Sequence, residues 1–457
     1  MQPGPGTAAP AAGSLPSGAT QRAGPVPTEA AEPAILTRLR TLWEAVKTSL
    51  WALPLAMVAA AFGLAYLVLT LGAGASDLWV LFGGSSSQAP SFLSSLMTAM
   101  INMATLAVSI TMVVLTLAAQ QLGPRLIRSF MGDRRTQAAL GLFIGTVIYL
   151  LLVLRNAYGK EQTVPVLAVT GGTVLVIICL VTLLLFLHHL ARSVVADSVI
   201  DRVGAQLDRD IRRLCPEHDP DDGPDETSFD NAAPVALRSG GYVQAVEFGT
   251  VLRAACAAHA CVRIDLRAGH HAVPGFIAAR VVPAEAASDD LVRKIQNAIV
   301  VGAERTTVQD LEYSVRQLVE VALRALSPGI NDVYTALAAI DRLALSLQVM
   351  MQRGAPQSVW RDDDGSVRVH ASVSTFAGVT GAAFDQIRQN SGGKPAVLIA
   401  MAGSIGQLLE QAHKDEHRRP LERHLRLVLA MGRRIIEDQD DLNDLEARAR
   451  AAHDETP

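Results

Sequence analysis

The chain has 457 residues, of which half are hydrophobic and only 18% are charged. This balance indicates a membrane protein with an additional soluble part, because a wholly soluble chain carries more charge. The net charge of -4 and the lack of basic clusters interleaved with aromatic residues argue against a nucleic-acid partner.

The N-terminal segment, 1–34, is rich in Pro, Ala and Gly and carries only Arg22, Glu29 and Glu32 as charges. Such a segment buries too little apolar surface to fold, so we expect a disordered tail. It lacks the basic start and the short apolar core of a secretory signal peptide.

Four uncharged stretches follow, each long enough to cross about 30 Å of hydrocarbon as a helix. They predict a transmembrane domain of four spanning helices at 35–192, with spans near 51–71, 92–121, 136–154 and 165–187. Lys and Arg gather on one side of these spans, which predicts that both termini are cytoplasmic.

Four arginines lie between the second and third spans: Arg125, Arg128, Arg134 and Arg135. One interpretation is that they surround the cytoplasmic mouth of a path and favour anions. The other is that they only fix the topology by lying among lipid phosphates.

The second span carries a polar stripe on one side of an otherwise apolar helix. An advance of about 100° per residue places the following side chains close to one line: Ser95, Thr98, Asn102, Thr105, Ser109, Thr116 and Gln120. Unpaired polar groups are costly in hydrocarbon, so this face must meet another helix or water.

Two interpretations of the stripe stay open at this point. Hydroxyls and an amide at one angle can line a conduction path, and they can equally form a packing seam between helices. The spans contain no acidic or basic residue, which argues against a proton-coupled transporter. A pore built on one stripe needs several copies, so it implies self-association.

The region after Arg192 is large enough to bury its own core. We expect a stalk helix and an acidic linker at 193–231, a cytosolic α+β domain at 232–449 and a polar tail at 450–457. The α+β domain begins with a small β unit, with strands at 242–248, 261–266 and 276–282 and a short helix near 251–258. A mainly helical remainder follows, with helices at 291–301, 308–326, 334–351, 396–411 and 421–449 and a hairpin at 360–367.

An unusual turn joins two of these helices at 324–332. Pro328 and Gly329 force the turn, and Asp332 is placed to cap the next helix. A ligand pocket or an interface is one interpretation, and a purely structural turn is the other. The candidate residues are Asp310, Tyr313, Arg316, Gln317, Ser327, Asn331, Asp332 and Asp341.

No pattern in the sequence supplies a metal site, a cofactor site or a catalytic centre. Cys256, His259 and Cys261 lack a fourth zinc ligand and the usual spacing, so core packing is favoured. His188 and His189 are either a pH sensor or an interfacial pair. The absence of phosphate-binding, dinucleotide-binding and hydrolase motifs predicts that the chain is not an enzyme and needs no cofactor.

Several motifs resemble those of a bacterial family of predicted membrane proteins, domain-of-unknown-function family 2254. In the membrane part they are 115–125, Phe130-Met131-Gly132-Asp133 and 140–144, and in the soluble part Gly241-Tyr242-Val243-Gln244, Glu304-Arg305-Thr306 with Gln309-Asp310, and 325–332 with Thr335-Ala336 and Asp341. Val333 stands where the family pattern leads us to expect a proline. The resemblance covers 36–449 and implies a bacterial inner-membrane protein, without implying an activity.

The sequence therefore supports two hypotheses. The first is an oligomeric channel with an uncharged pore, lined by the second span and regulated by the cytosolic domain. The second is a membrane-anchored sensor or scaffold, whose cytosolic domain binds a protein or a small ligand without conduction. Both have the lipid bilayer as a partner.

Overall fold

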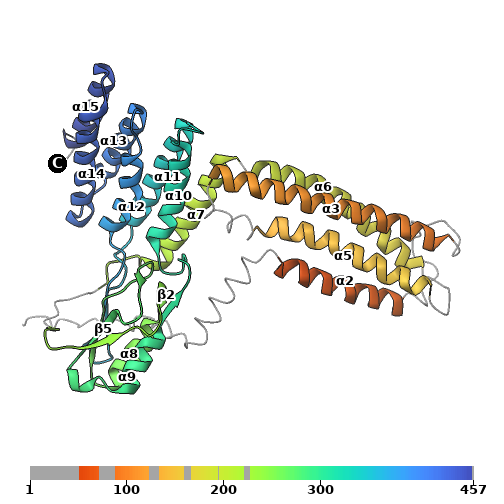
Figure 1. The fold of residues 1–457 in the computed structure, drawn as a ribbon, viewed down its shortest axis with the longest axis horizontal. Helices are drawn as coiled ribbons and strands as arrows, with labels where there is room; N and C mark the ends of the chain where they lie inside the picture. The colour runs from red at the N-terminus through yellow and green to blue at the C-terminus, as the bar shows by residue number, and fades with distance from the viewer. Residues whose placement is uncertain are drawn as a thin grey trace, which may run out of the picture.

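The computed structural model describes residues 51–71, 88–122, 133–158, 166–193, 195–220 and 227–454. The predicted N-terminal tail, most of the acidic cluster of the linker, Arg125 and Arg128 lie outside these residues. Two parts are visible in Figure 1: an elongated bundle of apolar helices, and an α+β part beyond one end of that bundle.

Four helices form the bundle, and α5 lies among the other three. Their bounds are α2 (Ala52–Leu71), α3 (Ala89–Leu122), α5 (Arg134–Ala157) and α6 (Val166–Ser193). α5 contacts α2, α3 and α6, and it is the most buried of the four. The elements begin and end close to the predicted spans.

Small residues set the close approach of α5 to its neighbours. Gly141 and Gly145, one turn apart on α5, face α2, and a Cβ at Gly141 would lie 2.9 Å from the Pro54 Cα. This spacing of small residues is a common device for packing membrane helices. One turn further along α5, the Tyr149 hydroxyl donates to the Ala168 carbonyl of α6 at 3.0 Å.

Five helices of the described residues are long and apolar enough to cross a membrane, and the fifth is α11 (Val333–Met351). α11 lies in the α+β part, where it packs against α7, α10 and α13. It carries Asp341 and Arg342 near its middle, and the Arg342 guanidinium pairs with Asp208 at 2.6 Å.

The predicted stalk helix is not a free-standing extension of the membrane bundle. α6 ends at Ser193, and α7 (Ala196–Leu214) begins as a separate helix. The apolar side of α7, including Val203 and Leu207, is buried against α10 and α11. The apolar spacing that predicted a helix also required a partner for this side, and the soluble part supplies it.

The β unit contains two sheets and two helices around one apolar core. The larger sheet has the order β1-β5-β3-β8-β7 and the smaller sheet has the order β4-β2-β6. The bounds are β1 (Ala233–Ala236), β2 (Gly241–Val246), α8 (Phe248–Ala257), β3 (Cys261–Ile264), β4 (His271–Ala272), β5 (Ile277–Val282), η3 (Ala284–Ala286), α9 (Asp289–Ala298), β6 (Ile299–Gly302), β7 (Val359–Arg361) and β8 (Val367–Ala371). The helix predicted to run to 301 ends earlier, because 299–302 pair with β2 as a strand.

The helical remainder packs into a second core with α7. It contains α10 (Leu311–Ala325), α11, α12 (Phe376–Gln389), α13 (Pro395–Glu410), α14 (Asp415–Ile435) and α15 (Gln439–Asp454). The sequence did not predict α12, and the helix predicted at 421–449 is two helices separated at 436–438. In Figure 1 these helices lie side by side, away from the β unit.

Candidate functional site

The polar stripe of α3 points away from the rest of the bundle. The buried side chains of α3, which include Leu93, Met100, Ala107 and Ala118, share the face that packs on α5 and α6. At about 100° per residue, the stripe centres about 180° from that face. Thr111, a polar residue off the stripe, is buried on the inner face.

All seven predicted stripe residues are exposed in the single chain: Ser95, Thr98, Asn102, Thr105, Ser109, Thr116 and Gln120. Four of the hydroxyls donate to a carbonyl one turn earlier on α3, from Ser95, Thr98, Thr105 and Thr116, at 2.9–3.0 Å. These bonds satisfy the hydroxyl protons within the helix, which lowers the cost of an apolar surrounding.

Asn102 differs from these hydroxyl residues. Its amide finds no hydrogen-bond partner among the described residues, and the same holds for the hydroxyl of Ser109 on the same face two turns later. An amide carries two donors and an acceptor, none of which α3 satisfies internally here. Asn102 is therefore the stripe residue with the greatest need for a partner outside the chain's own bundle.

Apolar side chains interrupt the stripe between Ser109 and Thr116. Met112 and Val113 are the exposed residues closest to the stripe line at this level, with 56% and 59% of their surface exposed. The outward face of α3 is thus polar on both sides of one apolar level.

α3 continues past the membrane core into contact with the soluble part. Its 34 residues extend for about 51 Å, against about 30 Å of hydrocarbon. Near its end, the Gln120 carbonyl accepts a hydrogen bond of 3.4 Å from Arg324, in the last turn of α10. α3 and α10 are therefore in direct contact, in addition to the covalent connection from α6 to α7.

The predicted arginines at this end are only partly described. Arg134 and Arg135 are exposed at the start of α5. Asp133 caps this helix and contacts His189 of α6 at 2.5 Å. His189 thus ties two bundle helices together at the end next to the soluble part.

The eight candidate residues of the soluble part do not form a single group. Asp310, Tyr313, Arg316 and Gln317 lie at the first turns of α10, and Ser327, Asn331 and Asp332 lie beyond its other end. Asp332 caps α11 as predicted, accepting from the Thr335 amide at 3.1 Å. Asp341 lies on α11, where the Ser404 hydroxyl is 3.4 Å away.

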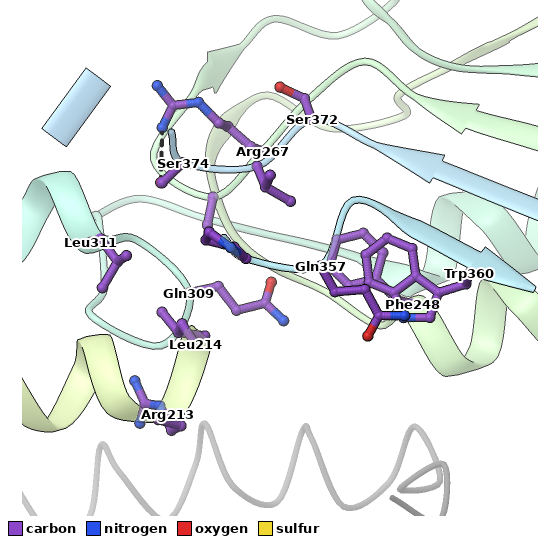
Figure 2. Close-up of a pocket in the computed structure, with 13 residues that line it drawn as sticks. Arg213, Leu214, Phe248, Arg267, Gln309, Leu311, Gln357, Trp360, Ser372 and Ser374 are labelled. Carbon is purple, nitrogen blue, oxygen red and sulfur yellow. Dashed lines mark hydrogen bonds between the residues drawn. The ribbon is translucent and has the colours of Figure 1, made fainter. Parts of the chain in front are cut away.

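A small cavity lies between the β unit and the helical remainder. It has a volume of about 170 Å³ and is lined mainly by apolar atoms. Figure 2 shows the rings of Phe248 and Trp360 on one side, stacked with 4.1 Å between their centroids. It also shows Arg267, whose Nη1 donates to the Ser374 hydroxyl at 3.4 Å.

A larger and more polar cavity of about 570 Å³ shares Arg267 with the small cavity. Arg267 and Arg305 line it together with Arg316 of α10, the one member of the predicted group that does so. Asp310 lies behind it, 1% exposed, paired with Arg305 at 2.6 Å. Sequence reasoning missed Arg267 and Arg305 as site residues. The only signal was the position of Arg305 inside a motif of the resembled family.

The sequence favoured core packing over a zinc site for Cys256, His259 and Cys261. Within the part of the chain that the structure describes, no three His, Cys, Asp or Glu side chains are grouped so that they could hold a metal ion. Cys261 is buried in β3, whose Val262 and Ile264 belong to the core of the β unit.

Apolar helices long enough to span a bilayer, joined to an α+β part, define a membrane protein. The chain belongs to the family described as "Predicted membrane protein (DUF2254)", whose model matches residues 47–407. It is similar to "Uncharacterized protein Mb1321c" of Mycobacterium bovis and "Uncharacterized protein Rv1290c" of Mycobacterium tuberculosis. Each is 27% identical over 420 residues, covering 89% of this chain and 80% of the relative. No solved structure matches the chain.

Proposed function

We propose that this protein is a homo-oligomeric channel of the bacterial inner membrane, in which the polar faces of α3 from several copies line an uncharged path. The four bundle helices are the spans, both termini are cytoplasmic, and the soluble part regulates the path. The observation that carries this proposal is the exposed polar face of α3, with an Asn102 amide that has no hydrogen-bond partner among the residues the structure describes.

The energetic argument rests on the alternatives open to Asn102. An amide facing lipid loses its hydrogen bonds to water and costs several kcal/mol. A partner from a second copy, or water along a central axis, removes this cost. Symmetric copies would bring the same residue from each chain to the same level around one axis, so amide would meet amide or shared water.

The apolar level at Met112 and Val113 has a role in this arrangement. Apolar constrictions close a polar path by excluding water, and water enters them again when they widen slightly. The ring formed by these side chains would be the narrow, closed part of the path. It lies between Asn102 and the end of α3 that contacts α10. Movement of the soluble part would act most directly on that end of α3.

The test is ion and small-solute flux from liposomes that contain the purified protein, with the oligomeric state measured in the same membranes. We expect flux, and assemblies larger than a dimer. The Asn102→Leu variant is expected to lower flux several-fold, whereas Val108→Leu, about 120° around the helix, leaves it unchanged. A wild-type protein that is monomeric, or that passes nothing at any voltage or pH, overturns the proposal.

The larger polar cavity favours a second candidate function, a membrane-anchored sensor or scaffold without conduction. In that case ligand binding to the soluble part alters a protein contact, and the α3 face serves only as a seam between copies. An assembled protein that binds a ligand but shows no flux would establish this alternative. Neither function needs catalysis, and we propose that the chain is not an enzyme.

A further inference from the structure

Charged side chains gather at the larger polar cavity. Three guanidinium groups, of Arg267, Arg305 and Arg316, line it, while two carboxylates, of Asp310 and Glu312, face them. Arg267 binds Glu312 at 2.6 Å and Arg305 binds Asp310 at 2.6 Å, so each of these two has a close counter-charge. Arg316 also lies near the Glu312 carboxylate, at 3.9 Å.

The guanidinium groups are held in place rather than spread over an open surface. Arg305 is 14% exposed and lies over the Tyr313 ring, with 5.6 Å from its Cζ to the ring centroid. The loop at Gly269, with φ of +90°, lies close against the Arg305–Asp310 ion pair, because a Cβ there would lie 2.2 Å from the Asp310 carboxylate. Preorganised guanidinium forks bind phosphate and carboxylate oxygens with little loss of side-chain freedom.

Aromatic rings also line the cavity. Tyr242 and His271 meet edge to face at 4.9 Å between ring centroids, and Phe276 remains 46% exposed. His270 lines the cavity too, and burial together with the charge of Arg267 lowers its pKa. The lowered pKa favours the neutral ring, which donates one hydrogen bond and accepts another.

We propose that this cavity binds a small organic phosphate of the nucleotide class. The phosphate would lie against Arg316 and the outer atoms of Arg267 and Arg305, and the planar base against Tyr242 and Phe276. The volume of about 570 Å³ is within the usual range of small-ligand sites. The proposal stands independently of conduction, because binding is measured on the protein whether or not it passes solutes.

Binding of AMP to the full-length protein in detergent, measured by calorimetry, tests this site. Adenosine and inorganic phosphate serve as half-ligand probes. We expect AMP to bind more tightly than either probe, and its affinity to fall as salt is raised. No binding of AMP, or binding of adenosine as tight as that of AMP, overturns the proposal.

Arg316→Gln is the informative variant, because Arg316 is exposed on α10 and its loss leaves the two close ion pairs intact. We expect the affinity for AMP to fall by about tenfold, the usual effect of losing one hydrogen bond to a charged group. Arg293→Gln makes the same charge change on α9, at a side chain that is 56% exposed and paired with Asp290. An equal loss in both variants would show a general charge effect and refute the assigned site.

Discussion

The close packing of α2 on α5 gives a stability prediction with a built-in control. A Cβ added at Gly141 of α5 would lie 2.7 Å from the Met57 Sδ and 2.9 Å from the Pro54 Cα. At Gly63 of α2, an added Cβ would meet nothing within 4 Å. Replacing each glycine by alanine therefore makes the same chemical change in a crowded and in an open position.

The expected magnitudes follow from these distances. Alanine is favoured over glycine in a helix interior by about 0.5–1 kcal/mol, so Gly63→Ala should stabilise the protein by about that amount. Gly141→Ala gains the same term, but its methyl group overlaps a backbone atom that cannot rotate away. Overpacking of this kind costs about 1–3 kcal/mol, and this cost is the expected difference between the two variants.

Gly145→Ala provides an intermediate point in the same series. The nearest atoms, the Ala61 Cβ and the Met57 carbonyl oxygen, lie 3.4 Å away, which is an ordinary contact distance. We expect the order of stability to be Gly63→Ala, then Gly145→Ala, then Gly141→Ala. This order depends only on the approach of α2 to α5.

Thermal unfolding of the purified variants in one detergent measures this order, with loss of the soluble monodisperse species as the readout. The wild-type protein is the reference. If the midpoint of Gly141→Ala equals or exceeds that of Gly63→Ala, then α2 does not approach α5 as described, and the reasoning from the glycine contacts is refuted.

Three further predictions concern the path, its link to the soluble part and pH. Replacing Met112 and Val113 together by Ser should raise liposome flux at least several-fold, because a polar level fills with water more readily than an apolar one. Unchanged flux would show that Met112 and Val113 do not form a constriction in the path. Arg324→Ala removes a cation from the end of α3, a contribution of about 0.3–1 kcal/mol, and should change the open fraction by about two- to fivefold in single-channel recordings. Burial lowers the pKa of His417 and His424 from 6.5. As the pH drops below 6.5, the unfolded chain therefore takes up protons before the folded chain does. The free energy of unfolding should then fall by up to about 1.4 kcal/mol per pH unit for each group. The midpoint of thermal unfolding should therefore change less between pH 7 and pH 5 in His424→Phe than in the wild type. An equal change in both would contradict the lowered pKa of His424.

The sequence predicted those elements whose signal is local. The bundle helices follow from uncharged stretches, α10 from apolar residues at helical spacing, and the cap at Asp332 from its place after Pro328 and Gly329. Each of these features depends on residues within one or two helical turns. The direction of the α3 stripe relative to its own bundle depends instead on which face packs on α5, and the sequence left that open.

Features that depend on distant pairing were not predictable. The strand β8 lies parallel to β3, so Val369 is beside Val262, more than a hundred residues earlier. The polar cavity likewise joins Arg267, Arg305 and Arg316, which come from two loops and a helix. No periodicity links such residues, and only the fold brings their charges together.

The position of α10 connects the two proposals through one rigid element. Its first turns carry Glu312 and Arg316 at the polar cavity, and its last turn carries Arg324 at the end of α3. About 18 Å of helix separates Glu312 from Arg324, and α10 packs on α7, α11 and α12 along this length. A ligand held only by Arg267 and Arg305 reaches α10 only indirectly, through the ion pairs of these arginines with Glu312 and Asp310. A ligand that also binds Arg316 acts on α10 directly, and α10 contacts α3 of the bundle. Such a ligand should therefore fail to regulate the path in the Arg316→Gln variant, even at ligand concentrations that saturate this variant.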